Sequence, residues 1–246
     1  MRKILVLCFV LSTVFLFAEE FAIAMPGSSP KLFANPATKE NTFELGLFGY
    51  KISEYDDYGR IGAYSNFPVK KFQTGFIFDY TFLESFYERI LSEYFVSYPQ
   101  KNYGLGLGYV SALNISKKDK TYHVSHFLIG GYFQIAEWIG IANHFQTEEF
   151  GFWQNHVALF FSLENYRFYV EYSVEKKLNF QIGQMLDFNS FALEFAYQYP
   201  HSRFYLGIDL KIKALHTFFG INSVTPEYLG YSWKLFYKKS KKTIFR

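Results

Sequence analysis

The sequence predicts an all-β protein, a closed antiparallel up-and-down transmembrane β-barrel of about 12–14 strands, with 14 preferred. Three observations lead to this prediction. The N-terminus has the layout of an export signal, aromatic residues make up 22% of the chain, and apolar side chains recur at alternate positions through residues 42–238. A membrane barrel explains the second and third observations together, because lipid-facing residues alternate with lumen-facing ones along each strand.

The first residues have the three-part layout of a secretory signal peptide. Arg2 and Lys3 give a positive start, residues 4–17 are uncharged, and Ala18 offers a small residue for cleavage. We favour cleavage after Ala18, with Ala24 as the alternative. An uncleaved anchor is less favoured, because a membrane-spanning helix needs about 20 apolar residues. Residues 1–18 are therefore expected to be removed during export.

The composition of the remaining chain narrows the function classes. The single cysteine, Cys8, lies in the signal segment, so the exported chain is expected to fold without disulfides. Without Arg2 and Lys3 the formal charge falls from +3 to about +1, which argues against a nucleic-acid partner. No later stretch holds about 18 consecutive apolar residues, so transmembrane helices are excluded as well.

Period-two alternation predicts the strands. It is clearest in residues 203–213, where Phe204, Leu206 and Ile208 share one face. Short polar links such as Glu164-Asn165 predict a meander of hairpins. Because a single-chain bacterial barrel has an even strand number, one run must be split, merged or missed. The thirteen runs are 42–50, 58–67, 72–82, 103–113, 121–136, 139–146, 152–163, 166–175, 178–187, 190–199, 203–213, 215–223 and 229–238.

Residues 83–98 do not follow this alternation. Phe86, Ile90, Leu91 and Tyr94 recur at three- and four-residue spacing, which predicts an amphipathic helix. We place this helix outside the barrel wall, either at the extracellular rim or dipping into the mouth, where it would gate the outer end. The alternative is an irregular strand, which would also correct the odd strand count.

The chain ends are expected to lie outside the barrel of residues 42–238. Residues 19–41 concentrate proline and serine and predict an irregular segment at the periplasmic end, with a position inside the lumen as an option. Residues 239–246 form a basic run, for which a solvated tail is the expectation. Tyrosines and tryptophans at strand ends, among them Tyr50 and Tyr58, predict aromatic girdles at the membrane interfaces.

Polar residues on the inward faces carry charges of both signs. Such a mixed set more often forms ion pairs that fill a narrow lumen than a charge-selective pore. The alternating Gly104, Gly106 and Gly108 predict an inner wall that is either tightly curved or crowded. The lumen-facing polar residues predicted from the alternation are Glu44, Arg60, Asp79, Arg167, Glu171, Glu194, Arg203, Asp209, Lys211 and Lys234.

The histidines are the candidates for chemistry. His123 and His126 lie three apart on one strand and so point to opposite faces, which excludes a joint metal site unless a bulge intervenes. His144 and His156 are expected to approach each other across a hairpin, where two imidazoles would be available to a metal or a serine. No serine-centred motif accompanies them. We therefore expect no catalytic residues, no metal and no cofactor.

Asn35-Pro36-Ala37, placed just before the first strand, resembles the motif near the N-terminus of the FadL-like and PorV-like outer-membrane β-barrel superfamily. The resemblance covers residues 19–50 by motif and the remainder by architecture. It implies a 14-stranded barrel whose N-terminal portion plugs the lumen, and transport of hydrophobic molecules or a structural or secretion-accessory role. Thr38 departs from the glycine that commonly follows the motif, and the short chain leaves little room for a full plug.

These observations predict a porin-like protein of the cell envelope, in the outer membrane of a Gram-negative-type bacterium. Its expected function is passive transport or binding of a small molecule, which the resemblance suggests is hydrophobic. The alternative is a structural envelope barrel with a plugged lumen and no transport, and a weaker one is a barrel enzyme that uses His144 or His156. The expected partners are outer-membrane lipid, a small hydrophobic ligand and the barrel-assembly machinery during biogenesis.

Overall fold

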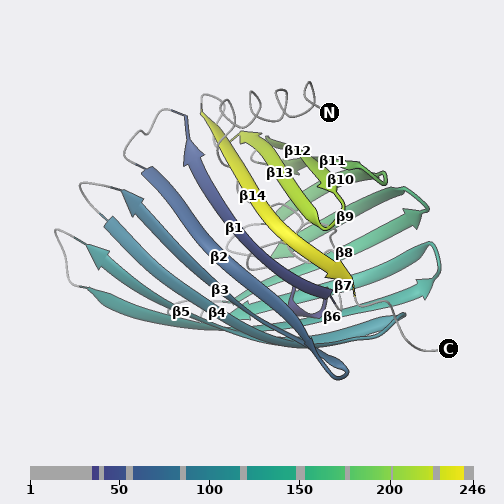
Figure 1. Cartoon of the computed structure of the whole chain (residues 1–246), viewed down its shortest axis with the longest axis horizontal. Coiled ribbons are helices and arrows are strands. Elements are labelled where there is room, and N and C mark those ends of the chain that lie inside the picture. Colours follow the sequence, from purple (N-terminus) through teal and green to yellow (C-terminus); the bar gives the residue numbers. More distant parts are fainter. Residues whose placement is uncertain are drawn as a thin grey trace.

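Fourteen antiparallel strands form a closed barrel in which each strand pairs with its neighbours in sequence and β1 pairs with β14 (Figure 1). The prediction of a closed meander with 14 strands is confirmed. A computed structural model describes residues 35–38, 42–53, 58–83, 87–116, 121–147, 153–174, 178–200, 202–223 and 228–240.

A short 3-10 helix, η1 (Pro36–Thr38), precedes the strands. Among the described residues no helix is both long and apolar enough to cross a membrane. The strands are β1 (Thr42–Ile52), β2 (Tyr58–Val69), β3 (Phe72–Leu83), β4 (Tyr87–Pro99), β5 (Tyr103–Ser116), β6 (Tyr122–Ala136), β7 (Ile139–Thr147), β8 (Trp153–Leu163), β9 (Tyr166–Val174), β10 (Leu178–Asp187), β11 (Phe191–Tyr199), β12 (Arg203–Ile212), β13 (Leu215–Ser223) and β14 (Leu229–Ser240).

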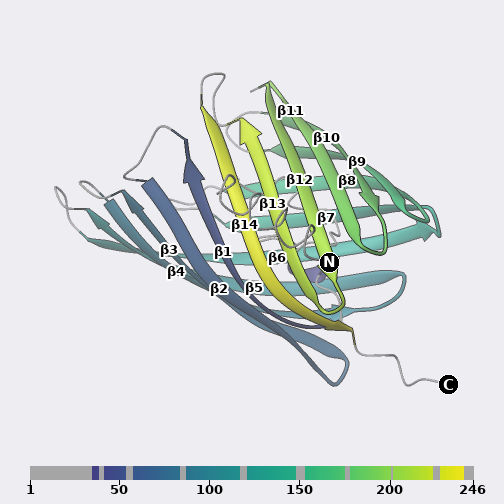
Figure 2. The same ribbon diagram turned by 45° about the horizontal axis from the view of Figure 1, so that its top comes forward.

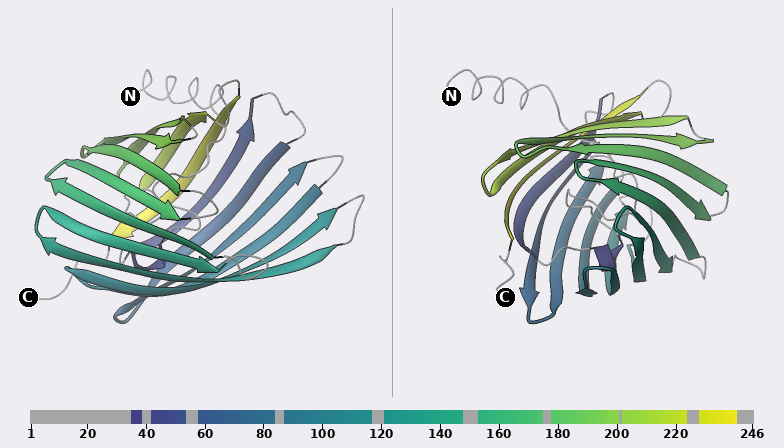
Figure 3. Two further views of the ribbon diagram at one scale, coloured as in Figure 1. Left: turned by 180° about the vertical axis from the view of Figure 1, so that it is seen from behind. Right: turned by 90° about the vertical axis from the view of Figure 1, so that its right-hand side faces the viewer.

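The two ends of the barrel differ. The short turns after β2, β4, β6, β8, β10 and β12 gather where β1 begins and β14 ends, and we call this the turn end. Figures 2 and 3 show the strands running obliquely around the barrel, as closure of a sheet requires. Strands β4, β5 and β6 have 13, 14 and 15 residues, whereas β7 and β9 have 9, so the wall is taller on the β4–β6 side.

The distribution of polar and apolar side chains is the reverse of that in a soluble protein, whose apolar side chains form the core. On β12, Phe204, Leu206 and Ile208 face outward and are 39%, 44% and 39% exposed, whereas the inward Asp209 is 3% exposed. The same holds on β11, where Phe195 is exposed and Glu194 is buried. Large apolar side chains therefore cover the outside and charged ones lie in the lumen, which is the arrangement the alternation predicted.

The helix predicted over residues 83–98 is wrong, and the strand alternative is correct. Residues 87–99 form β4 within the wall, so they do not make a separate gate at the outer mouth. The reason is that β4 carries apolar residues on both faces. Leu91 and Phe95 point inward and are buried, whereas Ile90 and Tyr94 point outward and are exposed. Two adjacent apolar pairs four residues apart imitate the spacing of a helix.

The predicted chain boundaries fall partly outside the described residues. The signal peptide of residues 1–18, both cleavage sites and the segment 19–34 lie there, as do residues 241–246. Lys239 and Ser240 belong to β14, so the wall extends two residues into the predicted basic tail. The girdle prediction is wrong for Tyr50, which faces the lumen and is 4% exposed, and for Tyr58, whose ring contacts Tyr50 and packs against the buried cluster of the inner wall.

Inside the barrel, aromatic rings cover glycines on adjacent strands. Tyr169 on β9 is fully buried over Gly183 on β10, with which it is paired in register. A Cβ atom added to Gly183 would lie 2.1 Å from Cζ of Tyr169. Similar contacts join Tyr64 to Gly46 and Phe160 to Gly140. These glycines leave room for the inward aromatic side chains.

Replacing Gly183 with alanine is therefore expected to lower the free energy of unfolding by about 1–3 kcal/mol, because the buried ring of Tyr169 has to move. Gly131→Ala is the matched control, since its Cβ would meet no atom closer than 3.7 Å. Urea unfolding of both variants in detergent micelles measures the difference. Equal losses in the two variants would contradict the steric explanation.

Candidate functional site: the lumen and its turn-end mouth

The Asn35-Pro36-Ala37 motif lies inside the barrel against β4, β5 and β6. Asn35 and Ala37 are completely buried. The Asn35 side chain donates from Nδ2 to the carbonyl oxygens of Asn143 at 2.8 Å and Gly131 at 3.1 Å. Its Oδ1 accepts a hydrogen bond from the Ala37 amide at 3.0 Å, which closes a local turn. One side chain thus links the N-terminal segment to two neighbouring strands.

Glycines form the surface on which η1 rests. A Cβ atom at Gly106 would lie 2.5 Å from the Ala37 nitrogen, and one at Gly130 would lie 1.8 Å from Oδ1 of Asn35. Gly104 is similarly close to the Ala37 carbonyl oxygen, whereas Gly108 lies under Leu128. Of the two predictions made from the alternating glycines, the structure shows the crowded inner wall. Over Gly106 the crowding comes from η1, and over Gly104 it comes from the Tyr132 ring as well as from η1.

Gly106→Val is expected to displace η1 from the wall, because the added side chain occupies the space of Pro36 and Ala37. We expect the Ala37 amide to lose its protection from hydrogen exchange, together with about 1–3 kcal/mol of stability. Gly108→Ala is the control, since its Cβ meets only the side chain of Leu128 at 3.1 Å. Unchanged protection of Ala37 in Gly106→Val would show that η1 is held elsewhere.

The predicted lumen-facing polar residues all lie on inward positions of the strands. Six of them are at most 7% exposed, and the remaining four are partly exposed near the strand ends. The buried six are Glu44, Asp79, Glu171, Glu194, Asp209 and Lys234, and the partly exposed four are Arg60, Arg167, Arg203 and Lys211.

Several of these charges are joined in pairs. Arg60 and Asp79 form an ion pair between β2 and β3, and Asp79 also accepts a hydrogen bond from Thr81 at 3.0 Å. Lys211 pairs with Asp187. The Lys234 ammonium lies 5.4 Å from the centre of the Phe218 ring, within reach of a cation–π interaction. The mixed signs therefore produce cross-strand pairs, as expected for a narrow lumen.

Sequence reasoning missed several lumen-facing residues. Lys238 lies 3.4 Å from Glu44 across the β14–β1 seam, and His216 lies 3.2 Å from Asp209. Glu93 on β4 is fully buried, but the helix prediction had removed its strand from the wall. Lys238 follows the inward parity of Lys234, so the same alternation contained the signal for it.

The histidines lie where the strand parity predicted. His123 faces outward, whereas His126 faces inward and is 7% exposed. His144 and His156 are opposite each other in the β7–β8 register, with ring centroids 5.9 Å apart. Within the ranges that the structure describes, no set of three or more His, Cys, Asp or Glu side chains is grouped to hold a metal ion.

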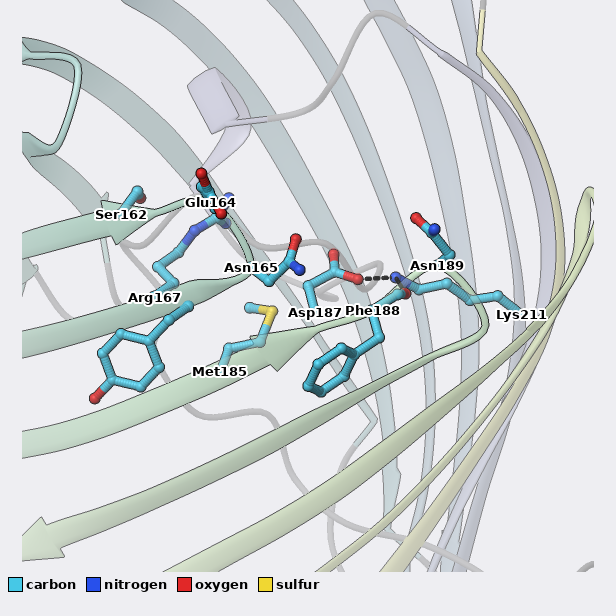
Figure 4. Close-up of a pocket in the computed structure, with 10 residues that line it drawn as sticks. Ser162, Glu164, Asn165, Arg167, Met185, Asp187, Phe188, Asn189 and Lys211 are labelled. Carbon is cyan, nitrogen blue, oxygen red and sulfur yellow. Dashed lines mark hydrogen bonds and ion pairs between the residues drawn. The ribbon is translucent and has the colours of Figure 1, made fainter.

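A polar cavity of about 360 Å³ opens at the turn end, between the turns after β8 and β10 (Figure 4). Arg167 and Lys211 supply positive charges, and Asp187 and Glu164 supply negative ones. Lys211 also donates to the Phe188 carbonyl oxygen at 3.2 Å, which fixes its position beside the turn. The other lining residues are Ser162, Asn165, Tyr166, Met185 and Asn189. Charged and amide groups at this mouth can hydrogen-bond a small solute.

No protein-family model and no curated protein matches this sequence. Among solved structures, the chain is similar to a mutant of the porin of Rhodopseudomonas blastica, with a TM-score of 0.48 and 7% identity over 80% of this chain and 99% of that one. It is also similar to the KdgM porin, with a TM-score of 0.48 and 8% identity over the same shares of the two chains.

Proposed function

We propose that this protein spans the bacterial outer membrane and provides passive passage or binding for a small molecule. The observation that carries the proposal is the reversal of polarity across the wall, with apolar side chains outside and charged ones inside. In hydrocarbon, every backbone polar group must be paired within the protein, and a closed sheet satisfies this requirement. The turn end, where both termini of the barrel lie, is assigned to the periplasmic side.

The cavity at the turn end favours a polar solute. Its charges of both signs and its amide groups suit a small molecule with hydrogen-bonding groups, whereas a hydrophobic ligand would form no hydrogen bonds with them. A hydrophobic ligand is implied only by the resemblance of Asn35-Pro36-Ala37 to the FadL-like and PorV-like superfamily. We therefore place membership of that superfamily, and a hydrophobic cargo, second to a polar solute.

The side chains that fill the interior favour the alternative function, a structural envelope barrel with a plugged lumen and no transport. Phe48, Tyr64, Tyr169, Tyr205 and Phe218 belong to one buried cluster on the inner wall. Together with η1, these rings narrow the lumen, as would suit an envelope barrel without transport. In either case the function needs no catalysis, and the lumen acts by size, hydrogen bonding and charge.

Planar-bilayer recordings on the purified protein separate passage from the structural alternative. We expect discrete current steps from the wild type, and a changed ratio of cation to anion permeability in Lys211→Glu, because Lys211 lines the cavity. Lys213→Glu makes the same charge change at an exposed turn residue outside the cavity and should leave the ratio unchanged.

A binding assay completes the test. Equilibrium binding of a labelled fatty acid distinguishes the hydrophobic cargo from a polar one, which would give current without fatty-acid binding. If membranes that contain the folded protein show no current and no fatty-acid binding, the transport function is excluded and the structural envelope barrel remains.

A further inference from the structure

Two histidines on neighbouring strands face the same part of the lumen. His144 and His156 are 0% and 4% exposed, and their ring planes meet at 59°. They occupy directly opposite positions of the β7–β8 ladder, so their Cα positions are fixed relative to each other by the hydrogen bonds of the wall. Ala142 and Ala158, the next inward residues toward the turn end, are small.

His156 is oriented by a carboxylate on the next strand. Its Nδ1 lies 3.1 Å from Oε1 of Glu171 on β9, and both side chains are at most 5% exposed. A carboxylate at this distance favours the proton on Nδ1, which leaves a lone pair on Nε2. That Nε2 atom is buried and has no hydrogen-bond partner among the described residues. Metal-ligating histidines commonly show this arrangement, with the second ring nitrogen bonded to a carboxylate.

We propose that His144 and His156 bind one divalent transition-metal ion, such as Zn²⁺ or Cu²⁺, with Glu171 as a positioning residue for His156. Imidazole nitrogens are preferred ligands of these ions. Metal–nitrogen bonds of about 2.0–2.1 Å place the centroids of two rings that share an ion roughly 5–6.5 Å apart. The observed separation of 5.9 Å falls in this range. The protein supplies two ligands, and water or a luminal solute fills the remaining positions.

A second luminal histidine provides a control. His216 lies 3.2 Å from Asp209, which repeats the imidazole–carboxylate contact, but its ring is stacked on Phe236 at 4.7 Å instead of facing another imidazole. It therefore has the positioning contact without the second ligand. The proposal requires only the luminal placement of these residues and does not depend on the passage of a solute.

Isothermal titration of the purified full-length protein, without a polyhistidine tag, with Zn²⁺ tests the site. We expect one ion per chain, and binding at least about 100-fold weaker in His144→Gln and in His156→Gln. Glu171→Gln should weaken binding about 10–100-fold, as loss of such a carboxylate does in other metal sites. His216→Gln should bind like the wild type.

Electron paramagnetic resonance of the Cu²⁺-loaded wild type provides a readout that needs no variant. Hyperfine coupling to two imidazole nitrogens is expected. The proposal is overturned if the wild type does not bind one ion per chain, if both glutamine variants bind normally, or if His216→Gln loses binding to the same extent. If the substitutions prevent folding, the wild-type spectrum decides, and coupling to fewer than two nitrogens overturns the site.

Discussion

Replacing Asp79 with alanine is expected to destabilise the barrel by about 3–5 kcal/mol, because it leaves the Arg60 guanidinium in the lumen without its carboxylate. The side chains of Arg60 and Asp79 are 17% and 2% exposed, so water replaces the lost partner poorly. Asp79 also accepts from Thr81, and that hydrogen bond is lost as well. Urea unfolding in lipid vesicles, followed by tryptophan fluorescence, measures the change.

A control variant and a double substitution that restores stability test whether the unpaired charge causes the loss in Asp79→Ala. Asp187→Ala removes a carboxylate that also pairs with a lysine, but the Asp187 side chain is 40% exposed, so we expect a loss of at most about 1 kcal/mol. Combining Arg60→Met with Asp79→Leu should recover most of the stability, because neither charge remains. If Asp79→Ala costs no more than Asp187→Ala, the Arg60–Asp79 pair is not a buried electrostatic contact.

Placing an arginine on the outer face has the second large effect. Ile208 lies in the middle of β12, and Ile208→Arg is expected to cost about 2–4 kcal/mol if this face lies at the bilayer midplane. Ile212 ends the same strand and is 60% exposed at the turn end. There the same substitution should cost about 0–1 kcal/mol, since the penalty falls toward the interface. Equal costs at the two positions would show that the outer face has no depth-dependent apolar environment.

The sequence predicted the wall well because a strand's side chains alternate strictly between two faces. In β12, parity alone placed Phe204 outside and Asp209 inside, and the structure has them there. Alternation did not identify β4, where Leu91 packs on the lumen side against Val110 and Leu128 and Phe95 is buried as well, while apolar residues also cover the outer face. A strand that is apolar on both faces has no period-two signal.

The contacts that side chains make within the lumen were less predictable than the face of the wall on which each side chain lies. The approach of His144 and His156 followed from a single hairpin, and it is confirmed. The partnership of His156 with Glu171 depends on the register between β8 and β9, which the residues alone did not determine. The position of Asn35 depends on contacts with strands about 100 residues away in the chain, so no local pattern could have predicted its bonds to β6 and β7.

The central claim is that the apolar outer face contacts acyl chains, and spin labels placed one at a time along β12, from Arg203 to Ile212, test it most directly. In the reconstituted protein, prepared without residues 1–18 and therefore without Cys8, we expect collision rates with dissolved oxygen to alternate. Maxima should occur at Phe204, Leu206 and Ile208, and minima at the positions between them. A profile without alternation, or one in which a water-soluble quencher reaches these three positions best, would contradict the membrane assignment.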